Sequence, residues 1–385
     1  MKFWSTKAAP PPATKSEPAP LVALDLARRG LAAEAPAGFA ALSREGYRRN
    51  PVVYRCVRLL SETAASVPLK VAGGEASAVR SLLDATSPVG GVRALEAAFA
   101  HLAMTGSAYL RSTVVGERPV SLHALRPDSV TPATDARGRA VGWRVEEAGR
   151  SRTHRFDPVS HRSQILALHL FDPLDMGNGR GPLEACASAV GIHNEGARWT
   201  RSLLGNAACP SGALVYRGPP GAERLSDGQF ERLKSELSEQ HTGAARAGRP
   251  LLLEGGLDWR PMSLSPADMD FIEARREAAR EIALAFGVPP MLLGIPGDNT
   301  YSNYREANLA FWRQTVVPSV QRVAGAVGNW LRPWLGDDIT LVPDLDAVPA
   351  LSAERDALWA RVGGAAFLTD TERRELTGLD MGAEP

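Results

Sequence analysis

The spacing of apolar residues predicts amphipathic helices that alternate with short strands. In residues 50–71, an Asn-Pro pair opens a helical pattern, and Pro68 ends it before the strand-like segment VPLKV. A second helical pattern, around residues 95–103, runs through a Thr-Gly turn into the strand pattern SAYLRSTVV. The apolar face of the first helix consists of Val53, Val57, Leu60 and Ala64.

Residues 110–170 predict further short strands. The segments LHALRPDSVTP, GWRVEE and ILALHLF combine strand-like apolar patterns with proline and glycine turns. Helices and strands are thus mixed through roughly the first 175 residues, which is typical of one α+β module.

A long helical stripe follows in residues 182–205, where Pro182 suits the first turn and Gly205 suits the end. Residues 206–263 predict a smaller α+β insert. It contains a charged helix with Ser226 as its N-cap, and strands within GALVY, PLLLEGG and DWRPMSL.

The clearest helix covers residues 265–286, with Ser265 as its N-cap and Pro266 in its first turn. Its apolar face consists of Met269, Ile272, Ala279, Ile282 and Phe286. The remaining surface carries both signs of charge, as solvated helix faces do: Asp270, Glu273, Arg275, Arg276, Glu277, Arg280 and Glu281.

Residues 304–350 contain the longest helical pattern, followed by a strand near residues 338–343. Pro318 falls inside the helix and predicts a kink, because proline removes a backbone hydrogen bond. The apolar seam repeats in a heptad-like manner and consists of Val316, Val320, Val323, Val327, Trp330 and Trp334.

The two ends of the chain differ. Residues 1–20 are rich in proline, alanine and lysine and predict a disordered arm. The C-terminal region predicts two short helices, one from Ser352 to Val362 and one from Asp370. Thr369 and Glu372 form a capping box at the start of the second helix.

Composition fits a globular protein and narrows the functional classes. The 385 residues are 44% hydrophobic and 23% charged, and the formal net charge of +1 gives no overall basic field. The three cysteines lie far apart without a CxxC pair, so we expect no disulfide frame and no zinc site. The sequence has neither a membrane-spanning apolar run nor a secretory signal.

Catalytic and nucleotide-binding motifs are weak. The loop Gly177–Gly181 precedes a helix, but Pro182 occupies the position of the last glycine in a GxGxxG motif. His154, His161 and His169 have no metal-ligand spacing and are expected to be structural. No nucleophile elbow, P-loop or paired-carboxylate signature is present. We therefore expect no enzyme activity, no metal and no cofactor.

Several segments together resemble one family. They are NPVVYRCVRLLSETAASVPLKV, HLAMTGSAYL, GRGPLEAC, NAACPSGAL and AREIALAFGVPPMLLGIPGDNTYSNYREANLAFWRQTVVP. They are similar to portal proteins of tailed double-stranded DNA phages, of the siphophage type with the Hong Kong-phage capsid lineage. The resemblance covers about residues 45–375 and is carried above all by the helix, FGVPPxLLG loop and helix in succession.

The resemblance implies an α+β portal fold. Residues 21–181 correspond to the wing, residues 206–263 to the clip, and residues 351–385 to a short crown. Two stem helices flank the clip, at residues 182–205 and 264–286. A tunnel loop at residues 287–303 leads into the long kinked helix and the wing strand of residues 304–350.

It also implies a function and partners. Portal proteins form a ring, usually dodecameric, at one capsid vertex, and double-stranded DNA passes through it during packaging and ejection. The large terminase, the major capsid protein and the head–tail adaptor are the expected partners, with assembly in the bacterial host cytoplasm. Both a phage and a gene transfer agent fit the sequence.

The resemblance further implies where DNA passes. The tunnel-loop candidates are Gly294, Gly297, Asp298, Asn299, Thr300, Tyr301, Ser302 and Asn303. On the stem, the candidates are Arg275, Arg276 and Arg280, offset by neighbouring acids so that DNA is contacted weakly. From the residues alone, an ordinary helix–helix linker explains residues 287–303 equally well.

Two alternatives to a portal protein remain open at this point. One is another virion structural or adaptor protein, and the other is a nucleotide-binding enzyme that uses the loop Gly177–Gly181.

Overall fold

The computed structural model describes residues 38–85, 91–175, 177–205, 212–217, 226–241, 257–261, 271–296 and 301–378. These residues belong to one compact unit of the chain, Pro36–Pro385. The predicted arm of residues 1–20, and the first part of the predicted wing up to residue 37, lie outside the described residues.

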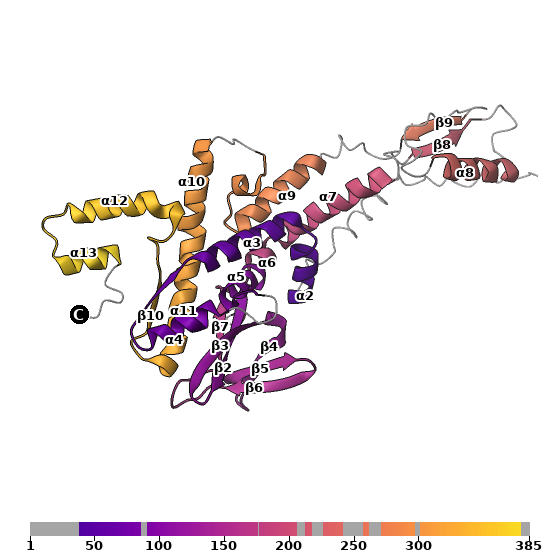
Figure 1. The fold of residues 1–385 in the computed structure, drawn as a ribbon. Coiled ribbons are helices and arrows are strands. Elements are labelled where there is room, and N and C mark those ends of the chain that lie inside the picture. The colour runs from indigo at the N-terminus through magenta and orange to yellow at the C-terminus, as the bar shows by residue number, and fades with distance from the viewer. Residues whose placement is uncertain are drawn as a thin grey trace, which may run out of the picture. The chain divides into compact units, whose positions relative to one another are not determined.

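Helix α3 (Pro51–Ser66) lies at the centre of the fold (Figure 1). Its predicted start is confirmed, because the Oδ1 atom of Asn50 accepts hydrogen bonds from the backbone N–H groups of Val52 and Val53 at 3.0 and 3.1 Å. The predicted apolar face is buried. The short helices α2 (Phe39–Ala41) and η1 (Leu42–Tyr47) precede it, and α4 (Ala76–Asp84) follows.

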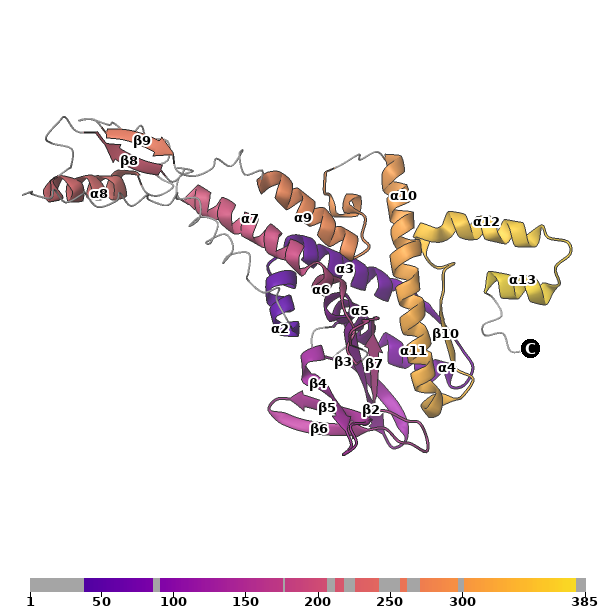
Figure 2. The ribbon, with the colours of Figure 1, turned by 180° about the vertical axis from the view of Figure 1, so that it is seen from behind.

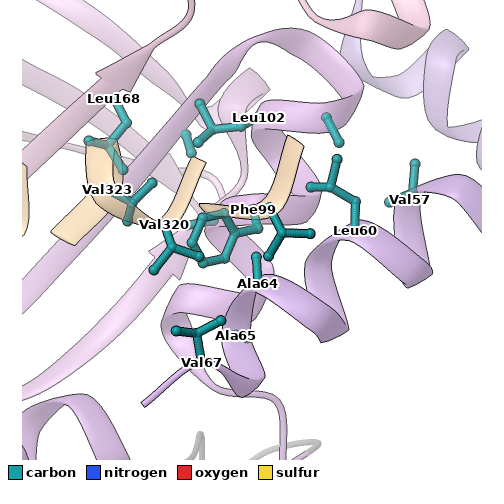
Figure 3. Close-up of a cluster of buried hydrophobic side chains, with 14 of the residues drawn as sticks. Val57, Leu60, Ala64, Ala65, Val67, Phe99, Leu102, Leu168, Val320 and Val323 are labelled. Atoms are coloured by element: carbon teal, nitrogen blue, oxygen red, sulfur yellow. The ribbon is translucent and has the colours of Figure 1, made fainter. Parts of the chain in front are cut away.

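The main core forms where α3 meets α5 (Ala94–Thr105) and α11 (Val317–Leu335). Figure 3 shows Phe99 of α5 among Ala64 of α3 and Val320 and Val323 of α11. These side chains come from segments more than 200 residues apart, so the core joins the predicted wing to the predicted long helix.

Two three-stranded sheets build the lower part of Figure 1. In one, β2 (Ser107–Val115) lies between β3 (Arg118–Leu125) and β7 (Ile165–His169). In the other, β5 (Ala140–Glu147) lies between β4 (Val130–Thr134) and β6 (Arg150–Arg155). All pairs are antiparallel. A second apolar cluster joins the sheets and contains Tyr109, Leu125, Val130, Val145 and Ile165.

A two-stranded sheet closes the chain on itself. Strand β1 (Leu69–Ala72) pairs antiparallel with β10 (Thr340–Pro343), with Lys70 opposite Val342. This confirms the predicted strand near residues 338–343 and places it against the predicted wing.

The predicted helix of residues 182–205 is two helices, which corrects the prediction. Helix α6 (Pro182–Ala185) ends at Cys186, and α7 (Ala187–Gly205) follows. The backbone angles of Cys186, φ −102° and ψ 17°, depart from α-helical values and interrupt the helix. The next described elements are β8 (Gly212–Tyr216), α8 (Asp227–His241) and β9 (Leu257–Pro261), with β8 and β9 paired.

Helix α9 (Phe271–Ala285) confirms most of the next prediction, although the predicted start around Ser265 lies outside the described residues. Ala279, Ile282 and Phe286 are buried as expected. Ile272 is 65% exposed, contrary to the prediction. It shares a face with Ala279 but lies in the first turn of α9, where the described neighbours do not cover it.

The long helix has three parts. Helix α10 (Tyr301–Phe311) runs into a π-helical segment, η5 (Trp312–Val316), and then into α11. Pro318 lies in the first turn of α11 and cannot donate a backbone hydrogen bond. The helix is irregular just before it, in the π-helical segment η5. The seam from Val316 to Trp330 is buried, whereas Trp334 is only partly buried.

The C-terminal helices confirm the prediction. After η6 (Pro349–Leu351), α12 (Ser352–Gly363) and α13 (Asp370–Thr377) form a hairpin, seen from behind in Figure 2. The capping box of Thr369 and Glu372 is present in full.

Candidate nucleic-acid interface

Helices α7 and α9 are the predicted stem helices, and they lie side by side in both views (Figures 1 and 2). A side-chain atom added at Gly196 of α7 would lie 3.8 Å from Cβ of Arg275 on α9. This is an ordinary van der Waals distance, so the aliphatic part of Arg275 packs next to Gly196 and the two helices are in contact here.

The outer face of α9 carries mixed charge. Arg276 is exposed and forms an ion pair with Glu273 one turn earlier. Glu277 and Glu281 are also exposed. Exposed pairs of this kind contribute little to stability, and their net field on a passing polyanion is weak.

Arg275 lies partly buried at a polar junction that sequence patterns did not single out. Its Nε atom lies 3.4 Å from Nε2 of His193 on α7. On the other side of the ring, Nδ2 of Asn50 lies 3.2 Å from Nδ1 of His193 and donates to Oδ1 of Asn194 at 3.1 Å. Burial, with a smaller contribution from the Arg275 charge, lowers the pKa of His193.

The predicted tunnel loop leaves α9 through a tight turn. Gly287 has φ +62°, and its carbonyl accepts a hydrogen bond from Thr315 Oγ1 at 2.7 Å. A 3₁₀ turn, η4 (Pro290–Leu293), ends at Gly294 with φ +72°. Arg280, expected to face the channel, donates from a terminal nitrogen to the carbonyl of Pro296 at 2.8 Å and so connects α9 to this loop.

The remaining loop candidates divide into two groups. Gly297, Asp298, Asn299 and Thr300 lie outside the described residues. Tyr301, Ser302 and Asn303 form the first turn of α10, so the loop is three residues shorter than the predicted 287–303. Between Gly297 and the helix the sequence contains no further proline or glycine, so no helix-breaking residue prevents α10 from beginning at Tyr301.

The loop Gly177–Gly181 has a structural explanation. A Cβ at Gly179 would lie 2.1 Å from the carbonyl oxygen of Gly106, and one at Gly181 would lie 2.6 Å from the Gly106 nitrogen. Ser107 Oγ also accepts from the Gly179 N–H at 2.9 Å. These glycines pack backbone against backbone, so they are not free to cradle a phosphate.

Two of the three histidines singled out earlier, His154 and His169, have side-chain partners in the protein. His169 Nδ1 lies 3.0 Å from Ser107 Oγ, and His154 Nδ1 lies 2.7 Å from Gln164 Oε1. Within the described ranges, no three acidic, histidine or cysteine side chains are grouped as a metal site would require. None of the described helices is long and apolar enough to cross a membrane.

Known proteins have sequences similar to this one. The family model described as "Phage portal protein" matches residues 51–378. An uncharacterized protein of Rickettsia bellii is 41% identical over 342 residues, covering 87% of this chain and 88% of that protein. The portal protein of Enterobacteria phage HK97 is 22% identical over 314 residues, covering 77% of this chain and 70% of that protein.

Solved structures share the fold. A chain from the neck of an empty gene transfer agent particle, computed with C6 symmetry, is 45% identical with a TM-score of 0.68, covering 88% of this chain and 93% of that chain. A portal protein of the HK97 family from Corynebacterium diphtheriae has a TM-score of 0.55 at 17% identity, covering 80% and 98%. The match over residues 51–378 shows that the chain belongs to the phage portal protein family.

Proposed function

We propose that this portal protein forms a homo-oligomeric ring, expected to be a dodecamer, at the portal vertex of a particle, and that double-stranded DNA passes through the ring. The family supports a structural rather than a catalytic role. The similar neck structures, computed with C6 and C12 symmetry, support a ring, and their gene transfer agent particles favour that class of particle over a phage.

The paired helices α7 and α9 carry the proposal that DNA contacts the stem. The exposed face of α9 offers arginines beside acids, which suits a duct that attracts DNA without holding it. We propose Arg275, Arg276 and Arg280 as the stem residues nearest the DNA. Of these, Arg276 and Arg280 are exposed. Arg276 pairs with Glu273, whereas Arg275 contacts His193 of α7 and Arg280 contacts the loop.

We propose residues 287–303 as the tunnel loop and residues 206–263 as the clip that receives the large terminase and then the head–tail adaptor. The predicted wing would face the major capsid protein, and assembly would take place in the bacterial host cytoplasm. Support comes from the order of elements, since the insert with β8, α8 and β9 separates the two stem helices as a clip does.

The first test is the mass and shape of the purified full-length chain. Mass photometry is expected to show a species near twelve times 41.1 kDa, and electron microscopy a ring with a hole as wide as a DNA duplex. A monomer at every concentration, both alone and with the capsid protein present, would contradict the ring.

The tunnel loop has a separate test. Deletion of residues 294–300 should leave ring assembly intact but reduce the yield of packaged DNA in a packaging assay. The deletion spares Tyr301 and the rest of α10. Unchanged packaging by an intact ring would make the segment an ordinary linker.

A further inference from the structure

A polar cavity of about 400 Å³ lies away from the stem, between the second sheet and the C-terminal end of α11. It is bordered by the β2–β3 turn, strand β6, the loop after β6 and Trp334 of α11. Three arginines line it, namely Arg152, Arg155 and Arg162. We propose that this cavity binds a phosphate group, either free inorganic phosphate or one carried by a larger ester such as DNA.

Arg162 is held in place for such a role. Its Nε–H donates to the carbonyl of Pro333 at 2.8 Å, and its guanidinium stacks on the Trp334 ring, 5.0 Å from the ring centre. Both contacts fix the plane of the guanidinium, whose terminal nitrogens have only the long 3.6 Å ion pair from one of them to Glu117 among the described residues. A fixed arginine fork loses little conformational entropy when it binds an oxyanion.

Arg152 and Arg155 supply further positive charge from an open edge. Strand β6 is the outer strand of its sheet, and both arginines are exposed on it. Among the described residues, neither side chain has a hydrogen-bond or ion-pair partner. The cavity is therefore fixed on the Arg162 side and open to solvent on the β6 side.

The acidic residues at the cavity do not neutralise these arginines fully. Glu117 reaches Arg162 only at 3.6 Å, and its side chain is 86% exposed, so an oxyanion can displace it. The Asp157 carboxylate already accepts from Ser160 Oγ and from the backbone N–H groups of Val159 and Ser160. These bonds, the Ser160 hydroxyl first, lower the pKa of Asp157, so it stays ionised; the three lining arginines still outnumber the two carboxylates of Glu117 and Asp157.

Two buried polar atoms at the cavity lack a partner within the described part of the chain. They are Nε1 of Trp334 and Nε2 of His154, and His154 is only 8% exposed. The indole nitrogen is a donor only, and a buried donor without an acceptor destabilises a protein by about 1–3 kcal/mol. This unpaired donor belongs to the same Trp334 ring over which the Arg162 guanidinium lies.

Phosphate fits better than a carboxylate. A carboxylate has two oxygens, whereas phosphate offers three or four acceptors, which suits a cavity whose lining donors come from β6, the following loop and α11. A cavity of about 400 Å³ is also larger than one oxyanion, so the phosphate of a larger ester can enter from the β6 side.

The test uses the full-length chain and two probes. Inorganic phosphate is titrated by calorimetry against chloride at equal ionic strength, and a short DNA duplex is titrated by fluorescence anisotropy. The test variant is the double substitution Arg152→Gln and Arg155→Gln. The matched control is Arg150→Gln, which removes an exposed arginine from the same strand but outside the cavity.

We expect saturable phosphate binding that is about tenfold weaker in the double variant and unchanged in the control. Duplex binding weakened only in the double variant, without phosphate binding, would identify a DNA phosphodiester as the ligand. The proposal is overturned if neither probe binds, or if the double variant and the control behave alike. Ring assembly does not enter this readout, so failure here leaves the proposed portal function untouched.

Discussion

At the residue scale, the junction of Asn50, His193 and Arg275 follows from donor and acceptor counting. Oδ1 of Asn50 caps α3, so its NH₂ group must face His193. Two donors therefore face the ring, the Asn50 NH₂ group at Nδ1 and the Arg275 Nε–H, which donates to Nε2 at 3.4 Å, whereas a neutral ring has a single acceptor nitrogen. Protonation would add a second donor and a charge beside Arg275, so this site favours a neutral ring.

Asn50 is expected to be the most sensitive residue of this junction. Asn50→Ala removes the cap of α3 and leaves His193 and Asn194 without their donor, which should lower the free energy of unfolding by about 3 kcal/mol. Asn50→Ser keeps a capping oxygen but not the amide donor, and should lose about 1 kcal/mol less. Urea denaturation followed by circular dichroism measures both, and equal losses would rule out the capping contribution.

Lowering the pH should destabilise the protein through buried histidines. Burial lowers the pKa of His101 to about 4, and it also lowers the pKa of His193 and His169. Since the unfolded chain binds protons below about pH 6.5, stability is retained above that value and lost as the pH falls toward the folded pKa.

For His101 alone, the loss between pH 7 and pH 5 should be about 2 kcal/mol. His101→Phe keeps the edge-on ring contact with Phe39 and removes the titrating group, so the pH dependence of its unfolding free energy should be flatter by that amount. Identical pH profiles for the variant and the parent would contradict this assignment.

At the scale of elements, two glycines differ in whether the fold requires them. Position 179 requires glycine because a neighbouring backbone segment lies too close for a Cβ, whereas a Cβ at Gly191 within α7 would meet nothing within 4 Å. The two faces of helix α9 also differ in role: the buried face packs against the rest of the protein, and the outer face carries charged side chains.

Alanine substitutions separate the two glycines. Gly179→Ala should destabilise the protein by about 3 kcal/mol, because the backbone of Gly106 and Leu170 must move. Gly191→Ala should stabilise it by about 0.5–1 kcal/mol through helix propensity. Thermal unfolding of both variants is the measurement, and a neutral Gly179→Ala would reopen the question of what this loop does.

The charge balance of α9 predicts a change in DNA binding. Glu277→Lys should tighten duplex binding and steepen its salt dependence by about one phosphate contact per subunit, and so slow packaging. The control Glu375→Lys makes the same charge change on exposed α13. Anisotropy titrations at several salt concentrations compare them, and equal effects in both variants would remove α9 from the DNA path.

At the scale of the whole molecule, the chain is closed by contacts between its beginning and its end. Strand β10 completes a sheet with β1, and Ile339, Leu341, Val348 and Leu351 join the main core. Helices α12 and α13 follow this closure and are tied to it mainly through polar contacts, such as Arg355 with Asp346.

Two truncations test this closure. A chain that ends after Leu351 keeps every strand of the described sheets and should unfold cooperatively near the temperature of the full chain. A chain that ends after Gly336 loses β10 and four buried apolar side chains, and should lose on the order of 5 kcal/mol or more. Similar melting curves for the two truncations would show that β10 does not close the fold.

Much of the fold was predictable because local patterns carry it. The caps at Asn50 and Thr369 and the seam from Val316 to Trp330 follow from side-chain chemistry within one or two helical turns. Strand β6 was missed because its sequence RSRTHR has no apolar alternation and gains its place by pairing with β5. Ile272 was wrongly predicted to be buried. Periodicity shows which face of a helix a residue occupies, but it does not show whether another element packs against that face at every turn.

The candidate site was predictable only in outline. Its helices and loop were located from sequence, but the partners of Arg275 and Arg280 lie on other segments of the chain or at its turns. The phosphate cavity could not be predicted from the sequence. Arg152 and Arg155 lie about 180 residues before Trp334 along the chain, and only the fold brings these segments together.

The sequence by itself determined the helices, their caps, the turns at proline and glycine, and the membership of the portal family. These depend on interactions between near neighbours, or on motifs that survive as local order. Only the tertiary structure decided the closure of β1 by β10, the histidine junction and the cavity that three arginines line beside Trp334 of α11. Each of these depends on distant segments meeting in space, where burial and donor–acceptor pairing, rather than spacing along the chain, select the arrangement.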